Sequence, residues 1–513
     1  MRSIVEAVGS HAEHEPERPA ILFEGRTITY GALDAQIERM ARALRAWGLA
    51  SGDRVALFLE NCPEFVVAYL GVHLAGGIVV LVNAQYRQVE LSHILTDSGA
   101  RLCVTSAAGA EELTPLATPD LDALVIVYGA HPTHTVLGAE DFEAFLARGD
   151  TEPREPLTLP NEDAPAVLAY TSGTTGRSKG ALLLHRNLVA NVEAVTTAWR
   201  WTEADRLLLA LPLFHTHGLM VGVHGTLYTG ASVRLLRRFE AAEVLDILKE
   251  DEDVTMFFGV PTMYRRLVAQ AEREGAPTRR LRLYVSGSAP LSLQLFEEFS
   301  RLFGQPILER YGMTETIMNL TNPYDGERRA GTVGMPFPGQ EARVVDVATR
   351  QPVSDGETGE IEVRGPHVFS GYWNRPDATA EAFTEDGWFK TGDLGWRGAD
   401  GYYTIAGRAR ELIISGGYNV YPREVEDVLA RHPAVAEVAV IGLSDADLGE
   451  QVAAVVVRKD GAHVDADELV TYCRERLASY KKPRRVLFVE SLPRNALGKV
   501  QKHLLATRIP PDE

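Results

Sequence analysis

Cysteine is scarce in this 513-residue chain, which has only Cys62, Cys103 and Cys473. These three are odd in number and far apart, so the sequence excludes a disulfide framework and a cysteine-rich zinc site. Such sparse usage is typical of a reducing compartment. We therefore predict a cytoplasmic protein.

Basic residues are in deficit, with 52 lysines and arginines against 70 acidic residues and a formal net charge of −18. Nucleic acids and anionic membrane surfaces would be repelled by this charge, which argues against both as partners. An anionic small-molecule substrate would need a locally basic pocket.

A long uninterrupted apolar run is also missing. The most apolar stretch, VVAYLGVHLAGGIVVLV, contains His73 and is broken at Gly76 and Gly77. This pattern predicts a buried helix followed by a buried strand and argues against a membrane span. The first twenty residues lack the apolar core of a signal peptide.

The remaining pattern is that of an α/β protein with more than one domain. Strand-like segments alternate with helical ones up to about residue 308, as in doubly wound, mostly parallel sheets. From about residue 331, short strands with Gly and Pro turns predict a small antiparallel or barrel-like subdomain. A smaller α+β unit follows, so we predict an N-terminal domain over 1–409 and a C-terminal domain over 410–513.

The segment YTSGTTGRSKG (170–180) has the residues of a phosphate-binding loop, although its spacing differs from a Walker A loop. Hydroxyls and uncrowded backbone N–H groups bind anions, and the flanking pattern predicts a strand, a loop and a helix. A flexible surface loop has the same composition. The candidate ligands are Thr171, Ser172, Gly173, Thr174, Thr175, Gly176 and Lys179.

Four other segments each contain one chemically useful side chain. They are LERYGMTE with Glu315, WFKTGDLG with Asp393, GRARE with Arg408 and PRNALGKVQK with Lys499. A carboxylate at Glu315 suits Mg²⁺, which prefers oxygen ligands and usually binds together with substrate phosphates. Each residue taken alone also fits an ordinary surface charge.

In order and spacing, these segments resemble the adenylate-forming superfamily of acyl-CoA synthetases, luciferases and nonribosomal adenylation domains. The resemblance covers almost the whole chain. It implies that a carboxylate attacks the α-phosphate of ATP, leaving an acyl-AMP and expelling pyrophosphate. Coenzyme A then displaces AMP. The loop at 170–180 would hold the departing β- and γ-phosphates.

The resemblance also implies individual roles. Tyr311 would stack on adenine, Thr314 would touch the α-phosphate, Glu315 would hold Mg²⁺, and Lys499 would bridge the two reacting anions. The catalytic set is Lys499, Thr314, Glu315 and His215, with His215 at the entrance of the acyl pocket. The other implied nucleotide contacts are Gly287, Ser288, Ala289, Pro290, Glu309, Gly312, Met313, Asp393 and Arg408.

The C-terminal domain would move between the two steps in such an enzyme. Arg410 occupies the hinge position, where the superfamily usually has Lys or Asp. Rotation would withdraw Lys499 and present Gly416, Gly417 and Tyr418 to the pantetheine arm of coenzyme A.

Within the superfamily, VPTMYRRL, RLYVSGSAPL and ERYGMTETIMN look most like malonyl-CoA synthetases, which activate malonate or methylmalonate. Burying the second carboxylate unpaired would be costly, and arginine offers it a bidentate fork. The implied acid-binding residues are Arg266, Arg310, Ser288 and His215. The helical period around Arg266 leaves open that its side chain faces water.

Three alternatives also remain open. The substrate could be a short-chain, medium-chain or aromatic monocarboxylate, or the protein could load a carrier protein. It could also be a catalytically silent acyl-nucleotide binder, although Glu315, Lys499 and the complete 170–180 loop argue against silence.

Overall fold

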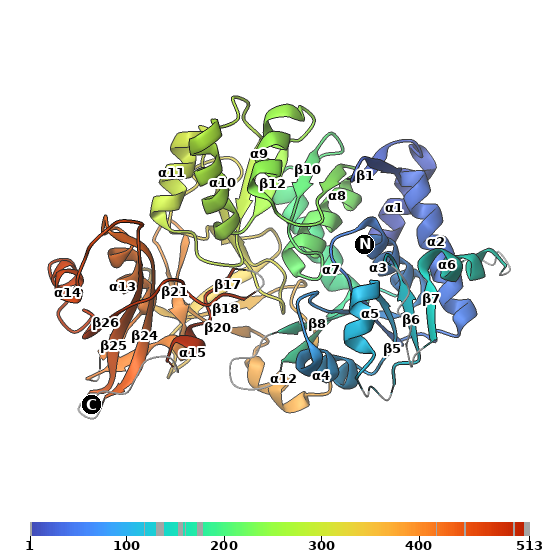
Figure 1. The fold of residues 1–513 in the computed structure, drawn as a ribbon. Helices are drawn as coiled ribbons and strands as arrows, with labels where there is room; N and C mark the ends of the chain where they lie inside the picture. Colours follow the sequence, from blue (N-terminus) through green and yellow to red (C-terminus); the bar gives the residue numbers. More distant parts are fainter. Residues whose placement is uncertain are drawn as a thin grey trace.

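The computed structural model describes residues 3–116, 118, 120–129, 138–151, 157–159, 161–171, 178–416, 418–445, 448–495 and 498–506. Within these ranges the chain forms a large N-terminal domain with three sheets and a small C-terminal domain with a fourth (Figure 1). The predicted α/β class with this division is confirmed.

The first sheet has nine strands, and its central part is parallel. In spatial order the strands are β16 (Met335–Pro336), β15 (Leu320–Thr321), β14 (Leu308–Tyr311), β13 (Leu283–Ser286), β12 (Met256–Gly259), β10 (Arg206–Leu209), β11 (Ser232–Leu235), β1 (Pro19–Phe23) and β2 (Arg26–Thr29). One face is covered by α9 (Ala241–Glu250), α10 (Pro261–Glu274) and α11 (Leu293–Phe303) (Figure 1).

The second sheet has eight strands and is also mostly parallel. Its spatial order is β19 (Gly371–Tyr372), β9 (Lys179–Leu184), β8 (Pro165–Thr171), β4 (Ile78–Leu81), β3 (Arg54–Phe58), β5 (Ala100–Thr105), β6 (Ala123–Ile126) and β7 (Gly138–Asp141). Its outer face packs on α4 (Gln88–Ser98) and α5 (Ala107–Leu113).

The largest core lies between these two sheets and the helices of the N-terminal region. The helices are α1 (Ile4–His14), α2 (Tyr30–Trp47), α3 (Pro63–Ala75), α6 (Phe142–Asp150), α7 (His185–Ala198) and α8 (His224–Thr229), with the π-helix η1 (His217–Val223) before α8. The predicted helix-to-strand turn is confirmed at α3. Its residues are buried on all sides, and Gly76 ends it with a φ of 88° before β4 begins.

The third sheet is the antiparallel unit that the Gly- and Pro-rich segment predicts. Its strands are β17 (Glu341–Val345), β18 (Gly359–Arg364), β20 (Phe389–Arg397) and β21 (Tyr403–Arg408), and the helix α12 (Pro376–Ala382) precedes β20. The predicted domain boundary falls in the short 3-10 helix η2 (Ala409–Glu411) and stays a prediction.

The C-terminal domain is a five-stranded sheet with three helices. Its elements are β22 (Ile413–Ser415), β23 (Tyr418–Val420), α13 (Pro422–Leu429), β24 (Val435–Asp445), β25 (Gly449–Arg458), α14 (Ala466–Arg474), β26 (Arg485–Phe488) and α15 (Lys502–Ala506). One face of this sheet packs on α13 and α14, and the other contacts α15.

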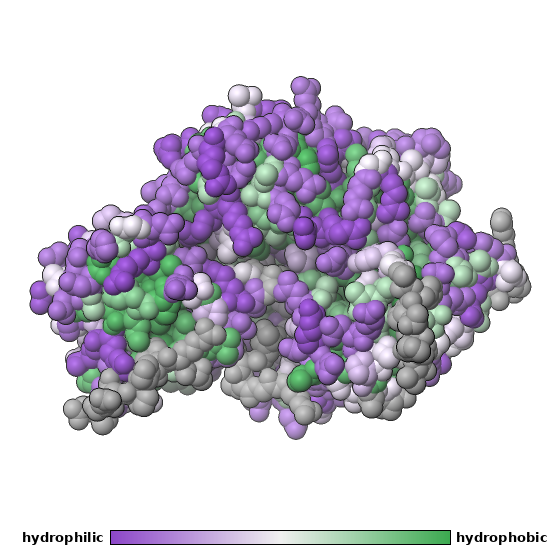
Figure 2. Space-filling model, in the orientation of Figure 1, coloured by the Kyte–Doolittle hydropathy of each residue, from purple (hydrophilic) through white to green (hydrophobic). Residues whose placement is uncertain are grey.

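The visible surface is mostly hydrophilic, with apolar side chains gathered around β24, β25 and β26 (Figure 2). None of the helices in the described ranges combines the length and the apolar character that a membrane crossing requires.

Candidate active site

The candidate site begins where parallel strands of the first sheet end. β12, β13 and β14 run parallel, so Gly259, Ser286 and Tyr311 lie at one edge of the sheet. Open α/β sheets bind ligands at the carboxyl ends of their strands. Segments 287–290 and 312–316, which contain predicted nucleotide contacts, follow directly after two of these strands.

Tyr311, Asp393 and Arg408 form the first cluster of this site. The Tyr311 hydroxyl donates a hydrogen bond to Asp393, and Arg408 Nε lies 2.7 Å from Asp393 Oδ1. Asp393 and Arg408 face each other across the β20–β21 ladder, and the negative charge of Asp393 raises the pKa of Arg408. Three residues predicted from separate motifs therefore come together in space.

Glu315 and Lys179 both interact with Tyr372. The Tyr372 hydroxyl donates to Glu315 Oε1 over 2.9 Å, and Lys179 Nζ is 5.1 Å from the centre of the Tyr372 ring. Thr171 donates weakly to the Lys179 carbonyl, at 3.4 Å. The residues flanking the predicted phosphate loop thus lie beside the predicted metal ligand, whose pKa is raised by burial.

Lys499 reaches the same region from the C-terminal domain. Its backbone exchanges two hydrogen bonds of 2.9 Å with Asn495. Burial and the charge of Arg408 lower the pKa of Lys499, whereas Asp393 raises it. The Lys499 loop also touches the N-terminal domain, because a Cβ at Gly498 would come within 2.6 Å of Thr262 Oγ1.

Arg310 is a buried cation with little to neutralise it. Its side chain donates one long hydrogen bond, 3.3 Å from Nη2 to Ser288 Oγ, and its Nε has no partner. In the part of the chain that the structure describes, no ion pair involves Arg310, which is only 3% exposed. Burial lowers its pKa to about 9. Gly287 leaves room for the guanidinium, since a Cβ there would lie 2.4 Å from Arg310 Cζ.

Comparison with known proteins identifies the family. A model of the AMP-binding enzymes matches residues 9–373, and a model of their C-terminal domain matches residues 424–499. The chain belongs to the AMP-binding enzyme family. The predicted membership of the adenylate-forming superfamily is thereby confirmed.

Individual members of this family are similar over nearly their whole length. Malonate–CoA ligase from Arabidopsis thaliana is 34% identical, covering 98% of this chain and 88% of the relative. The long-chain-fatty-acid–CoA ligase from Bacillus subtilis is 35% identical, covering 96% and 91%. The crystal structure of ATP-bound MatB from Rhodopseudomonas palustris is 38% identical, with a TM-score of 0.89 and 98% of each chain covered.

Several predicted nucleotide contacts lie near the Tyr311 cluster of this AMP-binding enzyme. Ser288, at a φ of 68°, and Ala289 are half-buried, Pro290 is exposed, and Met313 and Thr314 are half-buried. Gly312 has no space for a side chain, because a Cβ there would lie 2.0 Å from the Ile317 carbonyl oxygen. Ser172, Gly173, Thr174, Thr175 and Gly176 lie outside the described residues. All these nucleotide roles stay predictions.

Glu309 points to the other face of β14 from Arg310. Its Oε1 accepts a hydrogen bond of 3.1 Å from the Leu291 backbone, and burial raises its pKa to about 7. Arg423 of the C-terminal domain donates to the Leu291 carbonyl oxygen over 3.1 Å and partly offsets the shift at Glu309. The Glu309 side chain therefore faces the domain contact, and its proposed nucleotide role would have to come from its backbone.

Arg266 lies on the exposed side of α10, whereas Tyr264, Leu267 and Val268 are buried. No hydrogen bond or ion pair joins Arg266 to another described residue. It is one turn beyond Thr262, so the two side chains share the side of the helix that meets the Lys499 loop. The Arg266 side chain is therefore exposed to solvent, whereas that of Arg310 is buried. An acid-binding role for Arg266 stays a prediction.

The predicted hinge and coenzyme A residues lie at the start of the C-terminal domain. Burial lowers the pKa of Arg410, and the charge of Arg408 lowers it further. Gly416 adopts a φ of 58°, and Tyr418 stacks on Tyr480 with ring centres 4.6 Å apart. Tyr418 is 58% exposed, and Gly417 lies outside the described residues. In this arrangement Lys499 faces the site while Tyr418 faces solvent.

The residues that sequence reasoning missed are Tyr372 and His217. Tyr372 is a tyrosine in a turn-rich segment, and nothing in the local pattern links it to Glu315, 57 positions earlier. His217 follows His215 by two residues and is almost fully buried near Arg310. The second histidine of PLFHTHG was the signal in the sequence that could have pointed to His217. Burial lowers the pKa of the first histidine, His215, to about 4 and keeps its ring neutral.

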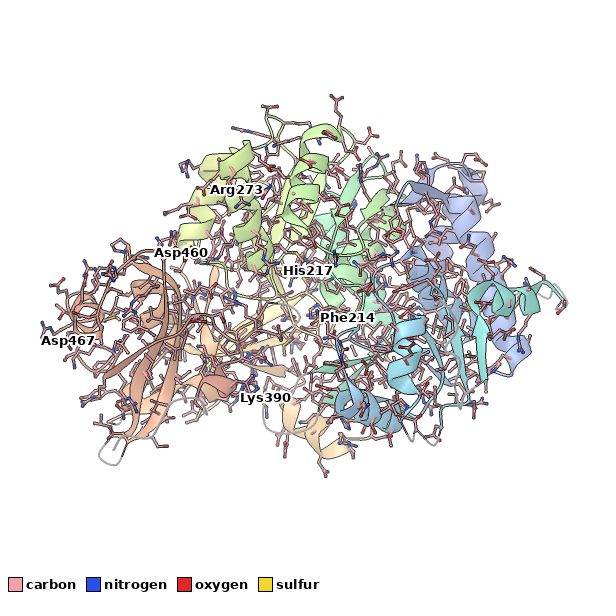
Figure 3. All side chains as sticks on the ribbon, viewed as in Figure 1. Phe214, His217, Arg273, Lys390, Asp460 and Asp467 are labelled. Atoms are coloured by element: carbon pink, nitrogen blue, oxygen red, sulfur yellow. The ribbon has the colours of Figure 1, made fainter. Side chains whose placement is uncertain are left out.

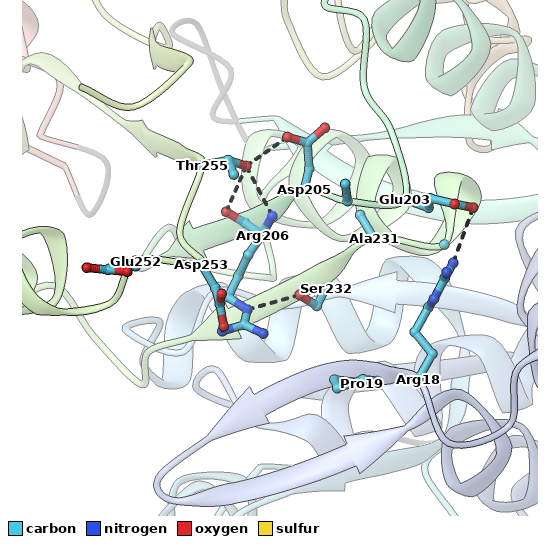
Figure 4. Close-up of a pocket in the computed structure, with 12 residues that line it drawn as sticks. Arg18, Pro19, Glu203, Asp205, Arg206, Ala231, Ser232, Glu252, Asp253 and Thr255 are labelled. Atoms are coloured by element: carbon cyan, nitrogen blue, oxygen red, sulfur yellow. Dashed lines mark hydrogen bonds and ion pairs between the residues drawn. The ribbon is translucent and has the colours of Figure 1, made fainter. Parts of the chain in front are cut away.

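A different pocket, of about 390 Å³, lies at the amino ends of β10 and β11 (Figure 4). Its charged side chains bind one another, as in the pairs Arg206–Asp253 at 2.7 Å and Arg18–Glu203 at 3.3 Å. It lies at the opposite end of these strands from the predicted motifs, so we assign no chemistry to it.

A metal ion bound only by protein is not supported in the described ranges, where no group of three potential metal-binding side chains occurs. Glu315 nevertheless fits Mg²⁺, because it is a buried carboxylate beside the Lys179 segment. Mg²⁺ is often held by one or two carboxylates together with substrate phosphates.

Proposed function

We propose that this enzyme activates malonate or methylmalonate, using ATP, Mg²⁺ and coenzyme A. The reaction class is ATP-dependent ligation of an acid to coenzyme A through an acyl-AMP, as the family and the named CoA ligases among its relatives support. The choice of acid needs a separate argument. Relatives of nearly equal identity are named for malonate and for long-chain fatty acids, so overall similarity does not select the substrate.

The first half-reaction follows from the cations of the site. Asp393 and Arg408 would bind the ribose, Tyr311 the adenine, and Lys179 with the 172–177 segment the β- and γ-phosphates. Glu315 would hold Mg²⁺, which neutralises phosphate charge. Lys499 would bring its positive charge between the acid and the α-phosphate, where two anions must approach each other. A carboxylate oxygen then bonds to phosphorus as the bond to pyrophosphate breaks.

The second half-reaction uses the same acyl-AMP. The thiol of coenzyme A gives up its proton, its sulfur bonds to the acyl carbon, and AMP leaves. We propose that Gly416, Gly417 and Tyr418 form the coenzyme A approach after a rotation about Arg410. Tyr418 now faces solvent, which is consistent with a surface that is used only after that rotation.

The burial of Arg310 without an ion pair among the described residues is the observation that supports a dicarboxylate substrate. A buried guanidinium without an ion pair is costly unless an anion arrives with the substrate. The second carboxylate of malonate supplies that charge and suits a bidentate fork. The chain of a fatty acid would leave Arg310 unpaired in an apolar environment.

The direct test is an acid panel with ATP, Mg²⁺ and coenzyme A, reading acid-dependent release of AMP. We expect malonate or methylmalonate to be used in preference to acetate, propionate and octanoate. A preference for octanoate would refute the proposal. Acid-dependent exchange of pyrophosphate separates an enzyme from a silent binder, and transfer to a carrier protein in place of coenzyme A would support the loading alternative.

The variant Arg310→Met tests the charge while keeping a long side chain. Breaking a desolvated charge pair from one side costs about 2–5 kcal/mol, or roughly 30-fold to several thousandfold in kcat/KM. We expect that loss for malonate and a much smaller one for propionate. Arg265→Met on the exposed side of α10 is the matched control. Equal losses for the two acids in Arg310→Met would contradict the assignment.

Arg266→Ala is a further arm of this experiment. If Arg266 helps to grip the second carboxylate, malonate turnover should fall while propionate turnover changes little. If neither rate changes, Arg266 is an exposed helix residue with no part in acid selection.

A further inference from the structure

His217 is a buried histidine whose two ring nitrogens both lack a partner. It is 1% exposed and begins the π-helix η1 (His217–Val223), an element that is often found at functional sites. Neither Nδ1 nor Nε2 has a hydrogen-bond partner among the described residues. Buried polar groups are normally satisfied, so two unpaired nitrogens in one ring indicate a missing ligand or water.

Other buried histidines in this protein do have partners. His73 Nε2 lies 3.1 Å from the Ala166 carbonyl oxygen, and His224 Nε2 lies 3.1 Å from the Tyr69 hydroxyl. His367 Nε2 lies 3.0 Å from Asn319 Oδ1. The fold therefore supplies partners to histidines that serve packing, and His217 differs from these three.

The register of the first sheet places His217 on the same face as Arg310. The His217 ring stacks on Phe258 of β12, with centres 5.9 Å apart. Phe258 pairs with Val285, and Val285 pairs with Leu308, two residues before Arg310. Because side chains alternate along a strand, Phe258, Leu308 and Arg310 lie on one face. His217 is in the interior of the N-terminal domain (Figure 3).

The charge environment of His217 agrees with this placement. Burial lowers its pKa well below the ordinary value, and the charge of Arg310 lowers it further. The imidazole is therefore neutral at physiological pH and has one N–H to donate. A neutral donor beside a cation suits an anionic group, because the donor adds a hydrogen bond without adding charge.

We propose that His217 is a specificity-determining residue that donates a hydrogen bond to the non-reacting carboxylate held by Arg310. This inference rests on the proposed dicarboxylate function. A monocarboxylate would leave both the His217 N–H and the Arg310 fork unpaired. The second ring nitrogen of His217 would accept a hydrogen bond from a water molecule beside the substrate.

The test compares two substitutions with a matched control. His217→Phe keeps a ring that can stack on Phe258 but removes the N–H, whereas His217→Gln keeps an N–H donor. His224→Phe is the control, because it replaces a buried histidine whose partner is Tyr69. For each variant, kcat/KM is measured with malonate and with propionate, and folding is checked by thermal unfolding.

We expect His217→Phe to lower the malonate-to-propionate ratio of kcat/KM by about 10- to 100-fold, mainly through KM for malonate. His217→Gln should recover at least part of that ratio, and His224→Phe should leave it unchanged. If His217→Phe lowers both acids by the same factor while wild type prefers malonate, the inference fails and the proposed function stands. If wild type prefers propionate, the proposed function fails and the inference fails with it.

A measurement on the wild-type protein covers the case in which a variant does not fold. The protein is labelled with ¹⁵N-histidine, and the His217 signals are assigned by their loss in His217→Gln or, if needed, in His217→Asn. With a non-hydrolysable ATP analogue present, malonate should shift the ring-nitrogen signals of His217, and propionate should not. Identical spectra with the two acids would overturn the proposal.

Discussion

Gly287→Ala would displace the Arg310 guanidinium without removing any charge. An added Cβ would lie 2.4 Å from both Cζ and Nε of Arg310 and 2.8 Å from Nη1. Ordinary carbon contacts need about 3.5 Å, so the guanidinium has to move by roughly 1 Å. Gly287 does not have a positive φ, and the displaced atoms end a flexible side chain. The free energy of unfolding should therefore fall by no more than about 1–3 kcal/mol.

Catalysis with malonate should be far more sensitive than stability. A displacement of about 1 Å in a positioning group can cost ~100-fold in rate. We expect kcat/KM for malonate to fall by about 10- to 100-fold and that for propionate by less than about 3-fold, since propionate has no second carboxylate. AMP release with each acid at saturating ATP measures both effects.

A double-variant cycle decides whether the methyl group acts through Arg310. In an Arg310→Ala background the added methyl meets no guanidinium, so Gly287→Ala should cost little there. The coupling free energy would be about 1.4–2.7 kcal/mol, equivalent to the 10- to 100-fold loss. An equal loss in both backgrounds would refute the reasoning. Gly287 would then act through the predicted nucleotide contacts that follow it.

Three further predictions concern other parts of the molecule. Lys499→Ala should block acid-dependent pyrophosphate exchange but spare thioester formation from supplied acyl-AMP, and equal loss of both would contradict a two-conformation cycle. Arg423→Ala removes the 3.1 Å contact with the Leu291 carbonyl oxygen across the domains, so it should slow acyl-AMP formation by about tenfold or less, with thioester formation from supplied acyl-AMP unchanged. Burial and the charge of Glu38 raise the pKa of Asp34 to about 6, so the folded state loses stability as pH rises from about 4 through 6. Asp34→Asn should therefore increase the free energy of unfolding in urea by about 1–3 kcal/mol at pH 8 and much less at pH 4, and an equal gain at both would refute the assignment.

Much of the fold follows from local patterns because helices and strands are specified by short-range periodicity. The apolar stretch around His73 gives a helix, a left-handed Gly76 and a strand, as its composition predicts. The same holds for the α+β pattern of the C-terminal domain. The resemblance also implied nucleotide roles for Tyr311, Asp393 and Arg408, and these three residues meet in one cluster.

The rest of the site depends on contacts between distant segments. Tyr372 reaches Glu315 through the pairing of β19 with β9, which no local pattern reveals. The position of Gly287 against Arg310 depends on the register of β13 with β14. For Arg266, helical periodicity indicated an exposed side and the resemblance indicated the acid site. The structure shows the exposure, and substrate is needed to test the role.

The cations of the site differ in how they are paired, and the difference matches their expected partners. Arg408 has a permanent partner in Asp393, 2.7 Å away, which suits a residue that orients a neutral ribose. Over the described ranges, Arg310 and Lys499 have no ion pair, and burial lowers the pKa of both. Each would therefore gain most from an arriving anion, Lys499 from the reacting carboxylate and phosphate, and Arg310 from the second carboxylate. In a chain with a net charge of −18, Arg310 and Lys499 would supply local positive charge for the proposed small dianion.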